Sequence, residues 1–304
     1  MGKIPILYYI RNACTRAYNR EKDDLSVESL HNSKKSSNFV PKIDANMKKA
    51  AILIAAVVLS MLSAAAKTQV AEVGYVVRDT INSVPCRVYL PHDYGKRAKK
   101  TEFPVLYLHH GMWGMEDDWT EQGHLVHYMD SLLRIGRVRE MVVIMPDNCP
   151  HRETSEEERD NAMSGEWERQ FPQFMAETER KYRVSRDPEK RAIAGLSMGG
   201  FHTMHVSYYL QDSFRYVGMF SPAIKPSIPN DIYDRWEEAV RMQLQKRPLY
   251  WIAIGREDFL YEDVQKYRRW LEANHLEYTY YESGGGHTWP NWQDYICRFL
   301  QLLF

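Results

Sequence analysis

The chain has 304 residues, of which 44% are hydrophobic, so it is long enough to bury a sizeable core. Its 40 basic side chains balance its 40 acidic ones overall, but residues 1–66 carry 10 basic and 5 acidic side chains, whereas residues 67–304 carry 30 and 35. A mildly acidic body gives no reason to expect nucleic-acid binding.

The first recognisable pattern begins at Met47. Two lysines follow it, and the uncharged run 50–66 ends in three alanines. A positive start, an apolar middle and a small-residue end are typical of a secretory signal peptide, so we expect residues 47–66 to be cleaved. Residues 1–46 are polar and without periodicity, and we expect them to be a disordered, non-native upstream extension. The alternative is a signal anchor, but 17 uncharged residues are at the short edge for spanning a membrane.

Residues 67–304 are the expected mature domain, exported to a periplasm or out of the cell and without stable membrane association after cleavage. They contain only Cys86, Cys149 and Cys297, so the chain has no disulfide framework, and one disulfide among the three stays open. No Cys/His cluster has zinc spacing, and we expect neither a metal nor an organic cofactor. The sequence does not indicate the oligomeric state.

Strand-like and helix-like patterns alternate along this domain. Short apolar runs predict strands at Val70–Arg78, Cys86–Leu90, Pro104–His109, Met141–Met145, Ala192–Leu196, Tyr216–Phe220, Leu249–Ile254 and Leu276–Glu282. Helical apolar spacing predicts helices at His124–Arg134, Glu166–Tyr182, Phe201–Tyr209, Ile232–Gln245, Tyr261–Asn274 and Trp292–Leu303.

Strands that alternate with helices indicate a mainly parallel sheet covered on both faces. The first two strands have no helix between them, so we expect them to form an antiparallel edge. This layout is typical of the α/β-hydrolase fold, in which chemistry takes place at the carboxyl ends of the strands.

The sequence Gly195-Leu196-Ser197-Met198-Gly199-Gly200 follows a predicted strand and precedes a predicted helix. A strand, a sharp turn with serine at its apex and a helix form a nucleophile elbow, in which glycines allow the tight turn. G-x-S-x-G alone also arises by chance, so partners of Ser197 are needed.

Two later strand ends supply these partners. One is followed by Glu257 and Asp258, and the next by a glycine-rich loop that ends in His287. The order Ser, acid, His is the one this fold uses. We expect His287 to be the general base and Asp258, in preference to Glu257, to orient its imidazole.

An oxyanion hole needs two backbone N–H donors. Met198, the residue after the nucleophile, is expected to supply one, and Met112, in the turn His110-Gly111-Met112-Trp113-Gly114 after an earlier strand, the other. A metal site at His109 and His110 is a poor alternative, because neighbouring side chains at a strand end point apart.

These motifs, together with Trp289 and Trp292 beside His287, resemble the esterase D-like family of α/β-hydrolases over residues 70–304. Within it the chain is most similar to bacterial feruloyl and acetylxylan esterases of carbohydrate esterase family 1. The resemblance implies Ser197, Asp258 and His287 as the triad, Met112 and Met198 as oxyanion donors, and Trp292 as a wall of the site.

Three further side chains are candidates for substrate binding. Trp113 and Trp292 could stack on a sugar or phenolic ring, and Glu166 opens a helix that could reach the cleft. The charged segment after Asp147 departs from the family pattern, which leaves the substrate open.

The resulting expectation is an exported serine esterase that hydrolyses feruloyl or acetyl esters on plant polysaccharide such as xylan. Alternatives within the family are a siderophore esterase, an S-formylglutathione hydrolase or an acyltransferase. A non-catalytic binding module on the same scaffold is the alternative from another class.

Overall fold

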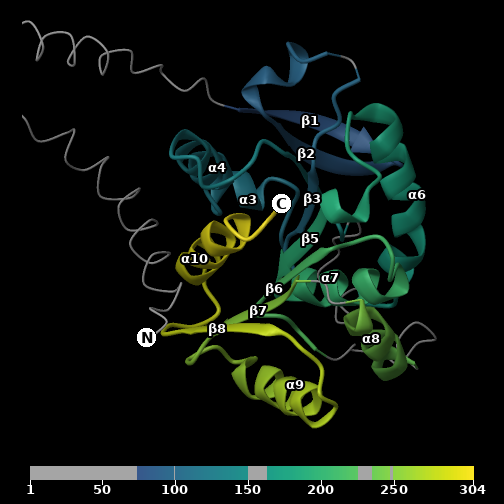
Figure 1. Cartoon of the computed structure of the whole chain (residues 1–304). Helices are drawn as coiled ribbons and strands as arrows, with labels where there is room; N and C mark the ends of the chain where they lie inside the picture. The colour runs from purple at the N-terminus through teal and green to yellow at the C-terminus, as the bar shows by residue number, and fades with distance from the viewer. Residues whose placement is uncertain (1–73, 99, 150–162, 225–234, 247–248) are drawn as a thin grey trace, which may run out of the picture. The chain divides into compact units, whose positions relative to one another are not determined.

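The computed structural model describes residues 74–304 apart from residue 99 and the segments 150–162, 225–234 and 247–248 (Figure 1). The expected signal peptide, the upstream extension and the charged run at 156–159 therefore lie outside the described residues. Among the residues described, no helix is long and apolar enough to cross a membrane.

Eight strands form one sheet in the order β1-β2-β4-β3-β5-β6-β7-β8. β1 pairs antiparallel with β2 and β2 with β4, and all other neighbours are parallel, so the predicted antiparallel edge is confirmed. The strands are β1 (Tyr75–Ile81), β2 (Val84–Leu90), β3 (Val105–His109), β4 (Val142–Pro146), β5 (Arg191–Leu196), β6 (Tyr216–Phe220), β7 (Leu249–Gly255) and β8 (Thr279–Ser283).

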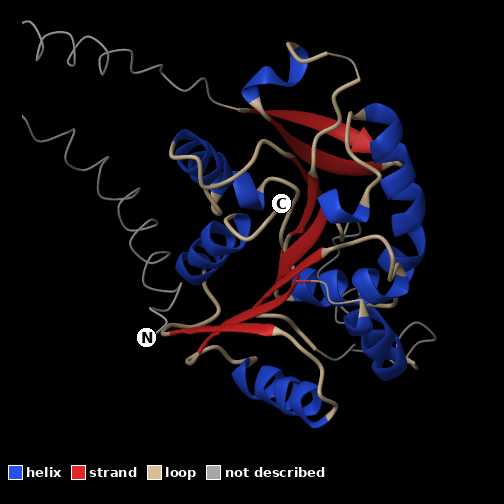
Figure 2. Ribbon diagram, in the orientation of Figure 1, coloured by secondary structure: helices blue, strands red, loops and turns tan. Residues whose placement is uncertain are grey.

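Helices cover both faces of the sheet (Figures 1 and 2). One face packs against α3 (Asp118–Glu121), α4 (Leu125–Arg134) and α10 (Trp289–Leu300). The other packs against α6 (Glu166–Lys181), α7 (Met198–Tyr209), α8 (Trp236–Gln245) and α9 (Tyr261–Ala273). Two short 3-10 helices, η1 (His92–Gly95) and η2 (Pro188–Lys190), complete the elements. The α/β-hydrolase fold expected from the sequence is confirmed.

The central strands are apolar runs because both of their faces are covered. Every residue of β3, β4 and β5 is buried, whereas the edge strand β8 is only half-buried. Helix α4 shows the matching helical pattern, since Leu125, Met129 and Leu132 recur on one face and are buried there.

Two predicted helices begin three residues earlier in the structure, and one short helix was not predicted, each for a local reason. α7 begins at Met198 instead of Phe201, because the turn residues Gly199 and Gly200 already belong to its first turn. α10 begins at Trp289, where Pro290 in the first turn needs no N–H partner. α3 was not predicted, because its four residues are too few to show a period.

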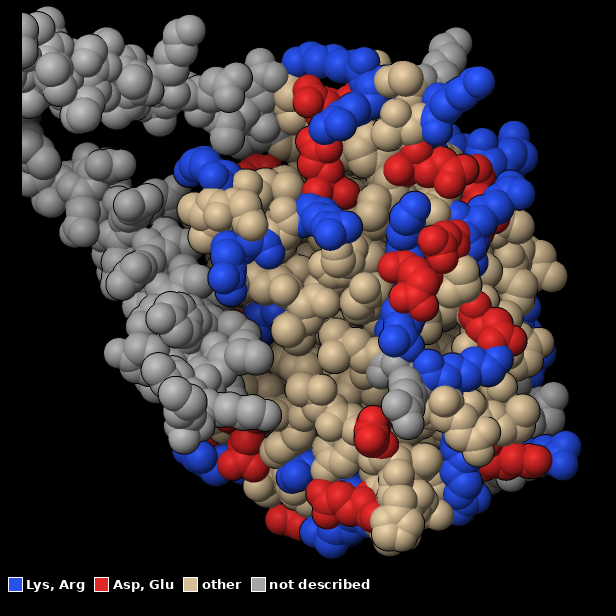
Figure 3. Space-filling model, viewed as in Figure 1, with Lys and Arg blue, Asp and Glu red and all other residues tan. Residues whose placement is uncertain are grey.

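Three cysteines lie in the described part of the chain. Cys86 and Cys149 are not in disulfides, so no disulfide joins two of Cys86, Cys149 and Cys297. Charged side chains of both signs are interspersed around a tan central area on the face shown in Figure 3.

Candidate active site

Ser197 stands at the apex of a sharp turn between β5 and α7. Its backbone has a φ of 54° and a ψ of −117°, a strained conformation for a non-glycine residue. The flanking glycines allow two backbones to approach: a Cβ on Gly195 would lie 2.9 Å from the His109 Cβ, and one on Gly199 would lie 2.8 Å from the His109 carbonyl oxygen. The turn therefore holds the serine hydroxyl above the end of the sheet.

Ser197, His287 and Asp258 form one chain of hydrogen bonds. His287 Nε2 lies 2.8 Å from Ser197 Oγ, and His287 Nδ1 lies 3.0 and 2.9 Å from the two carboxylate oxygens of Asp258. A carboxylate only accepts, so Nδ1 carries the ring proton, and Nε2 is free to accept the serine proton. This arrangement can activate a hydroxyl as a nucleophile.

The Asp258 carboxylate is held ionised at the buried end of this chain, where its residue is 4% exposed. Burial favours the neutral acid, but the hydrogen bonds from His287 and from the Leu260 N–H (2.9 Å) outweigh it and lower the pKa of Asp258. The side chain of the neighbouring Glu257 is exposed. Asp258 is therefore the carboxylate that the structure places against the histidine.

The loop that carries His287 is tied to helix α10. Asn291 Nδ2 donates to Gly284 O (2.9 Å) and Ser283 Oγ (3.1 Å), and its backbone N–H donates to Thr288 O (3.1 Å). Gly285 has a φ of 82° and lies so close to the Asn291 side chain that a Cβ there would collide with it. The imidazole is thus positioned by the start of the last helix.

Two backbone N–H groups flank the serine. Met198 is the first residue of α7, so its N–H has no carbonyl partner within the helix. Met112 lines the same pocket from the loop after β3. That loop is held by His110, whose Nδ1 donates to Gly111 O (2.6 Å) while its Nε2 accepts from the Asn148 N–H (3.2 Å). Both residues therefore lie beside Ser197, and their N–H groups stay the predicted oxyanion donors.

His109 was considered in the sequence only as a poor metal ligand, and the structure gives it other partners. The ring is fully buried, accepts from Trp167 Nε1 (3.2 Å) and donates from Nδ1 to Thr203 Oγ1 (3.2 Å). Its carbonyl accepts from Trp119 Nε1 (2.9 Å). Burial, together with the nearby His202, keeps the pKa of His109 well below its usual value, so the ring is neutral.

A cavity of about 280 Å³ opens beside Ser197, and we call it the tryptophan pocket. It is lined by Gly111, Met112, Trp113, Gly114, Asp118, Gln122, Leu196, Ser197, His287, Trp289 and Trp292. Trp113 is 63% exposed, whereas Trp292 is buried and packs edge-on against the His287 ring at 4.9 Å. Both tryptophans predicted to contact substrate therefore lie at the pocket.

The third predicted contact, Glu166, is exposed at the first position of α6 and is not among the residues that line the tryptophan pocket. Sequence reasoning missed Phe259, which is 76% exposed and has its ring 4.4 Å from that of His287. It follows Asp258 directly in sequence, and an aromatic residue at that position was the signal available.

A group of apolar side chains rich in sulfur also packs next to the Ser197 turn. We call the group of Met112, Cys149, Met163, Met198, Phe201 and Ala223 the sulfur-rich cluster. Met163, Met198 and Phe201 are buried, and Met112, Cys149 and Ala223 pack on them while remaining partly exposed. The Ala223 N–H donates to Ser197 O (3.1 Å), which fixes this cluster beside the turn.

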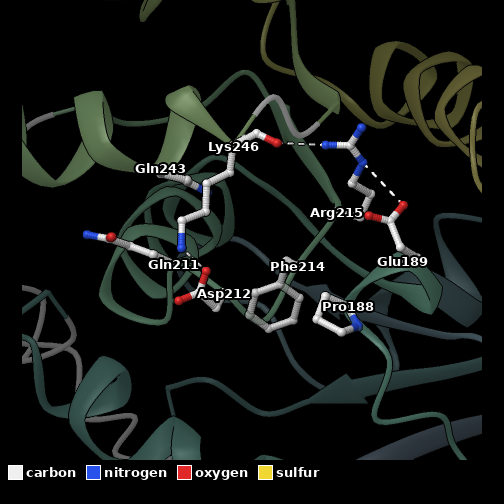
Figure 4. Close-up of a pocket in the computed structure, with 8 residues that line it drawn as sticks. All are labelled: Pro188, Glu189, Gln211, Asp212, Phe214, Arg215, Gln243 and Lys246. Atoms are coloured by element: carbon white, nitrogen blue, oxygen red, sulfur yellow. Dashed lines mark hydrogen bonds and ion pairs between the residues drawn. The ribbon is translucent and has the colours of Figure 1, made fainter.

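A second cavity of about 280 Å³ lies at the amino ends of β5 and β6, away from Ser197 (Figure 4). Its charged side chains satisfy one another: Arg215 pairs with Glu189 (3.3 Å) and donates to Lys246 O (2.9 Å), and Lys246 pairs with Asp212. Within the described part of the chain, no group of three or more His, Cys, Asp or Glu side chains is placed to hold a metal ion.

The chain matches the family model described as "Putative esterase" over residues 80–301. It is 30% identical over 143 residues to an endo-1,4-beta-xylanase/feruloyl esterase of Xylanibacter ruminicola, a stretch covering 44% of this chain but only 19% of that protein. It is 21% identical over 245 residues to an acetyl esterase of Caldicellulosiruptor saccharolyticus, covering 69% of this chain and 86% of the relative.

Solved structures of esterases are also similar to this chain. A ferulic acid esterase superimposes with a TM-score of 0.64 at 26% identity, covering 77% of this chain and 99% of the other. A CE1 ferulic acid esterase from Anaeromyces mucronatus, solved with ferulic acid, superimposes with a TM-score of 0.62 at 23% identity, covering 78% and 93% of the two chains, and bears on the fold alone. The chain therefore belongs to the "Putative esterase" family of carboxylic ester hydrolases and has the α/β-hydrolase fold.

Proposed function

We propose that this protein is an exported serine esterase that removes feruloyl or acetyl groups from plant cell-wall polysaccharide such as xylan. The observation that carries the esterase chemistry is the hydrogen-bonded chain from Asp258 through His287 to Ser197. The substrate class is supported by the names of the relatives, a xylanase/feruloyl esterase and an acetyl esterase. Export is supported by the signal-like pattern at residues 47–66.

In the proposed first step, Ser197 Oγ attacks the ester carbonyl carbon and His287 Nε2 takes the hydroxyl proton. The carbonyl π electrons move onto the carbonyl oxygen, which the N–H groups of Met112 and Met198 stabilise. When the intermediate collapses, the bond to the sugar oxygen breaks and His287 gives its proton to that oxygen. The sugar alcohol leaves, and the acyl group remains on Ser197.

Water then repeats the sequence. His287 removes a proton from water, the resulting hydroxide attacks the acyl carbon, and the bond to Ser197 Oγ breaks as His287 returns the proton to the serine. The carboxylic acid departs and the free enzyme is restored. Asp258 stays ionised throughout and stabilises the imidazolium in both halves, in keeping with its lowered pKa.

The test compares wild type and Ser197→Ala on feruloylated and acetylated xylo-oligosaccharides, with product analysis. Wild type should release ferulate or acetate, and Ser197→Ala should lose roughly 10⁴-fold or more in kcat while keeping its circular dichroism spectrum. Retained turnover in Ser197→Ala would contradict the mechanism. Preferential cleavage of a siderophore ester or S-formylglutathione, or transfer of the acyl group to a sugar acceptor, would replace the proposed substrate or reaction.

A further inference from the structure

The tryptophan pocket and the sulfur-rich cluster near Ser197 differ in chemical character. An ester presents two groups to an esterase, the acyl group and the alcohol, and they extend in different directions from the carbonyl carbon. The tryptophan pocket opens beside Ser197, and the sulfur-rich cluster, which shares Met112 with the pocket, packs next to the serine turn. The chemistry of each group indicates which half of the ester it accepts.

Trp113 is held in a doubly unfavourable state. Its indole is 63% exposed, and its backbone has a φ of 65°, in the left-handed region that favours glycine or asparagine. Glycine or asparagine would avoid both the exposed apolar surface and most of the backbone strain. Such strain collects at functional sites, so this ring is placed to contact a ligand.

Two polar side chains line the same pocket as that ring. Asp118 Oδ1 accepts a hydrogen bond from Gln122 Nε2 (3.2 Å), and both side chains line the pocket. Gly114 has no Cβ, and one would collide with the Asp118 carboxylate, so the glycine admits the carboxylate to the loop. An aromatic face beside a carboxylate and an amide suits a neutral ring that carries hydroxyl groups.

The position of His287 agrees with this assignment. The leaving alcohol oxygen receives its proton from His287 Nε2, so the alcohol must sit within hydrogen-bond reach of that nitrogen. His287 lines the tryptophan pocket together with Trp289 and Trp292. A group in this pocket is therefore next to the proton that it needs in order to leave.

The sulfur-rich cluster suits the other half. Its partly exposed members, Met112, Cys149 and Ala223, carry thioether, thiol and methyl groups and pack on the buried residues next to the serine turn. Sulfur atoms make favourable contacts with aromatic rings, and an apolar surface favours an uncharged acyl chain over a sugar.

We propose that the tryptophan pocket binds the sugar alcohol of the ester, with Trp113 as its stacking surface and Asp118 as its hydroxyl acceptor, while the acyl group lies over the sulfur-rich cluster. The proposal rests on the proposed activity toward sugar esters. In this proposal Trp113 and Asp118, which follow β3, determine which alcohol the enzyme accepts. Other residues determine which acyl group it accepts.

The first test uses two substrates with one acyl group and different alcohols, ethyl ferulate and feruloylated arabino-xylo-oligosaccharide. Trp113→Ala and Asp118→Asn should each lower the ratio of kcat/KM for the glycosyl ester to that for the ethyl ester, about three- to tenfold, mainly through KM. Trp113→Phe should retain most of the ratio. The control Tyr209→Ala removes an aromatic that is 46% exposed at the end of α7, and should leave the ratio unchanged. Equal losses on both esters in Trp113→Ala and Asp118→Asn would overturn the proposal.

The second test separates this proposal from the acyl specificity. Unesterified xylo-oligosaccharide should competitively inhibit p-nitrophenyl acetate hydrolysis by wild type, with an inhibition constant three- to tenfold higher in Trp113→Ala. If wild type cleaves p-nitrophenyl acetate but neither feruloyl nor acetyl sugar esters, the proposed substrate is wrong, and this inhibition still decides whether the pocket takes a sugar. Absence of inhibition, or equal inhibition of wild type and Trp113→Ala, would refute the sugar subsite.

Discussion

His109 Nδ1 donates a hydrogen bond of 3.2 Å to Thr203 Oγ1, joining the strand that leads to Met112 with the helix that begins at Met198. The two proposed oxyanion donors belong to different elements, and this buried contact sets one element against the other. The direction of the bond follows from Trp167, whose indole N–H can only donate to the opposite nitrogen of the ring.

Removing the acceptor of this bond should destabilise the fold. Thr203→Val replaces the hydroxyl with a methyl group of the same shape and leaves the buried His109 N–H unpaired, which should lower the free energy of unfolding by about 1–3 kcal/mol. Urea denaturation measures the difference. Thr203→Ser keeps the hydroxyl and is the matched control, so equal destabilisation by the two substitutions would contradict the role assigned to the bond.

The buried histidines should make stability depend on pH. Burial holds the pKa of His109 and of His205 well below the usual 6.5, so both are neutral in the folded protein and take up protons on unfolding at lower pH. Because the unfolded state binds more protons, the free energy of unfolding should fall as pH drops below about 6.5, by up to roughly 1.4 kcal/mol per pH unit for each histidine.

Urea denaturation between pH 7.5 and 5.0 tests this dependence. His205→Gln should make the decline shallower, because one of the two protons is no longer taken up. The surface substitution His275→Asn, at an exposed position with a φ of 56°, is the comparison. The same slope in wild type and His205→Gln would show that His205 is not neutral in the folded state.

The turn at Ser197 should not tolerate a methyl group. In Gly199→Ala the new Cβ would lie 2.8 Å from the Cβ and from the carbonyl oxygen of His109, and the backbone cannot move without shifting β3. We expect a loss of about 1–3 kcal/mol in stability and a fall in kcat. Gly95→Ala, whose Cβ would have no heavy atom within 4 Å, is the control for a glycine substitution as such.

Asp258→Asn should separate the proposed role of the acid from that of its neighbour. The amide cannot stabilise an imidazolium and favours the wrong tautomer of His287, so kcat should fall about 10⁴-fold with little change in KM. Glu257→Gln changes an exposed side chain and should stay within about twofold of wild type. Steady-state kinetics on p-nitrophenyl acetate measure kcat and KM for both variants. Comparable losses of kcat in both would refute the proposed role of Asp258 as the acid of the triad.

Much of this architecture follows from local sequence pattern. Apolar runs alternating with amphipathic segments predict the parallel sheet, and the glycines around Ser197 predict the turn, because both depend on neighbours in the chain. The choice of Asp258 over Glu257 rests on the alternation of side chains along an extended turn, and the structure places Asp258 inward and Glu257 in solvent.

Other features depend on packing between distant segments. Nothing near His109 in the sequence indicates that Thr203 or Trp167 will contact it, because those residues come from two helices that meet only in the folded protein. The same holds for Phe259 against the His287 ring. Glu166 does not line the tryptophan pocket for a related reason, since the face that a helix presents depends on how its whole length packs.

The attachment of the His287 loop to Asn291 has a consequence for biosynthesis. A chain translated only as far as β8 contains every strand of the described sheet and the serine turn, but it lacks both His287 and the Asn291 side chain that anchors its loop. Because proteins emerge from the ribosome amino end first, the nascent chain would remain without its general base until α10 has emerged and docked. The order of translation thereby delays nucleophile activation until α10 has been made.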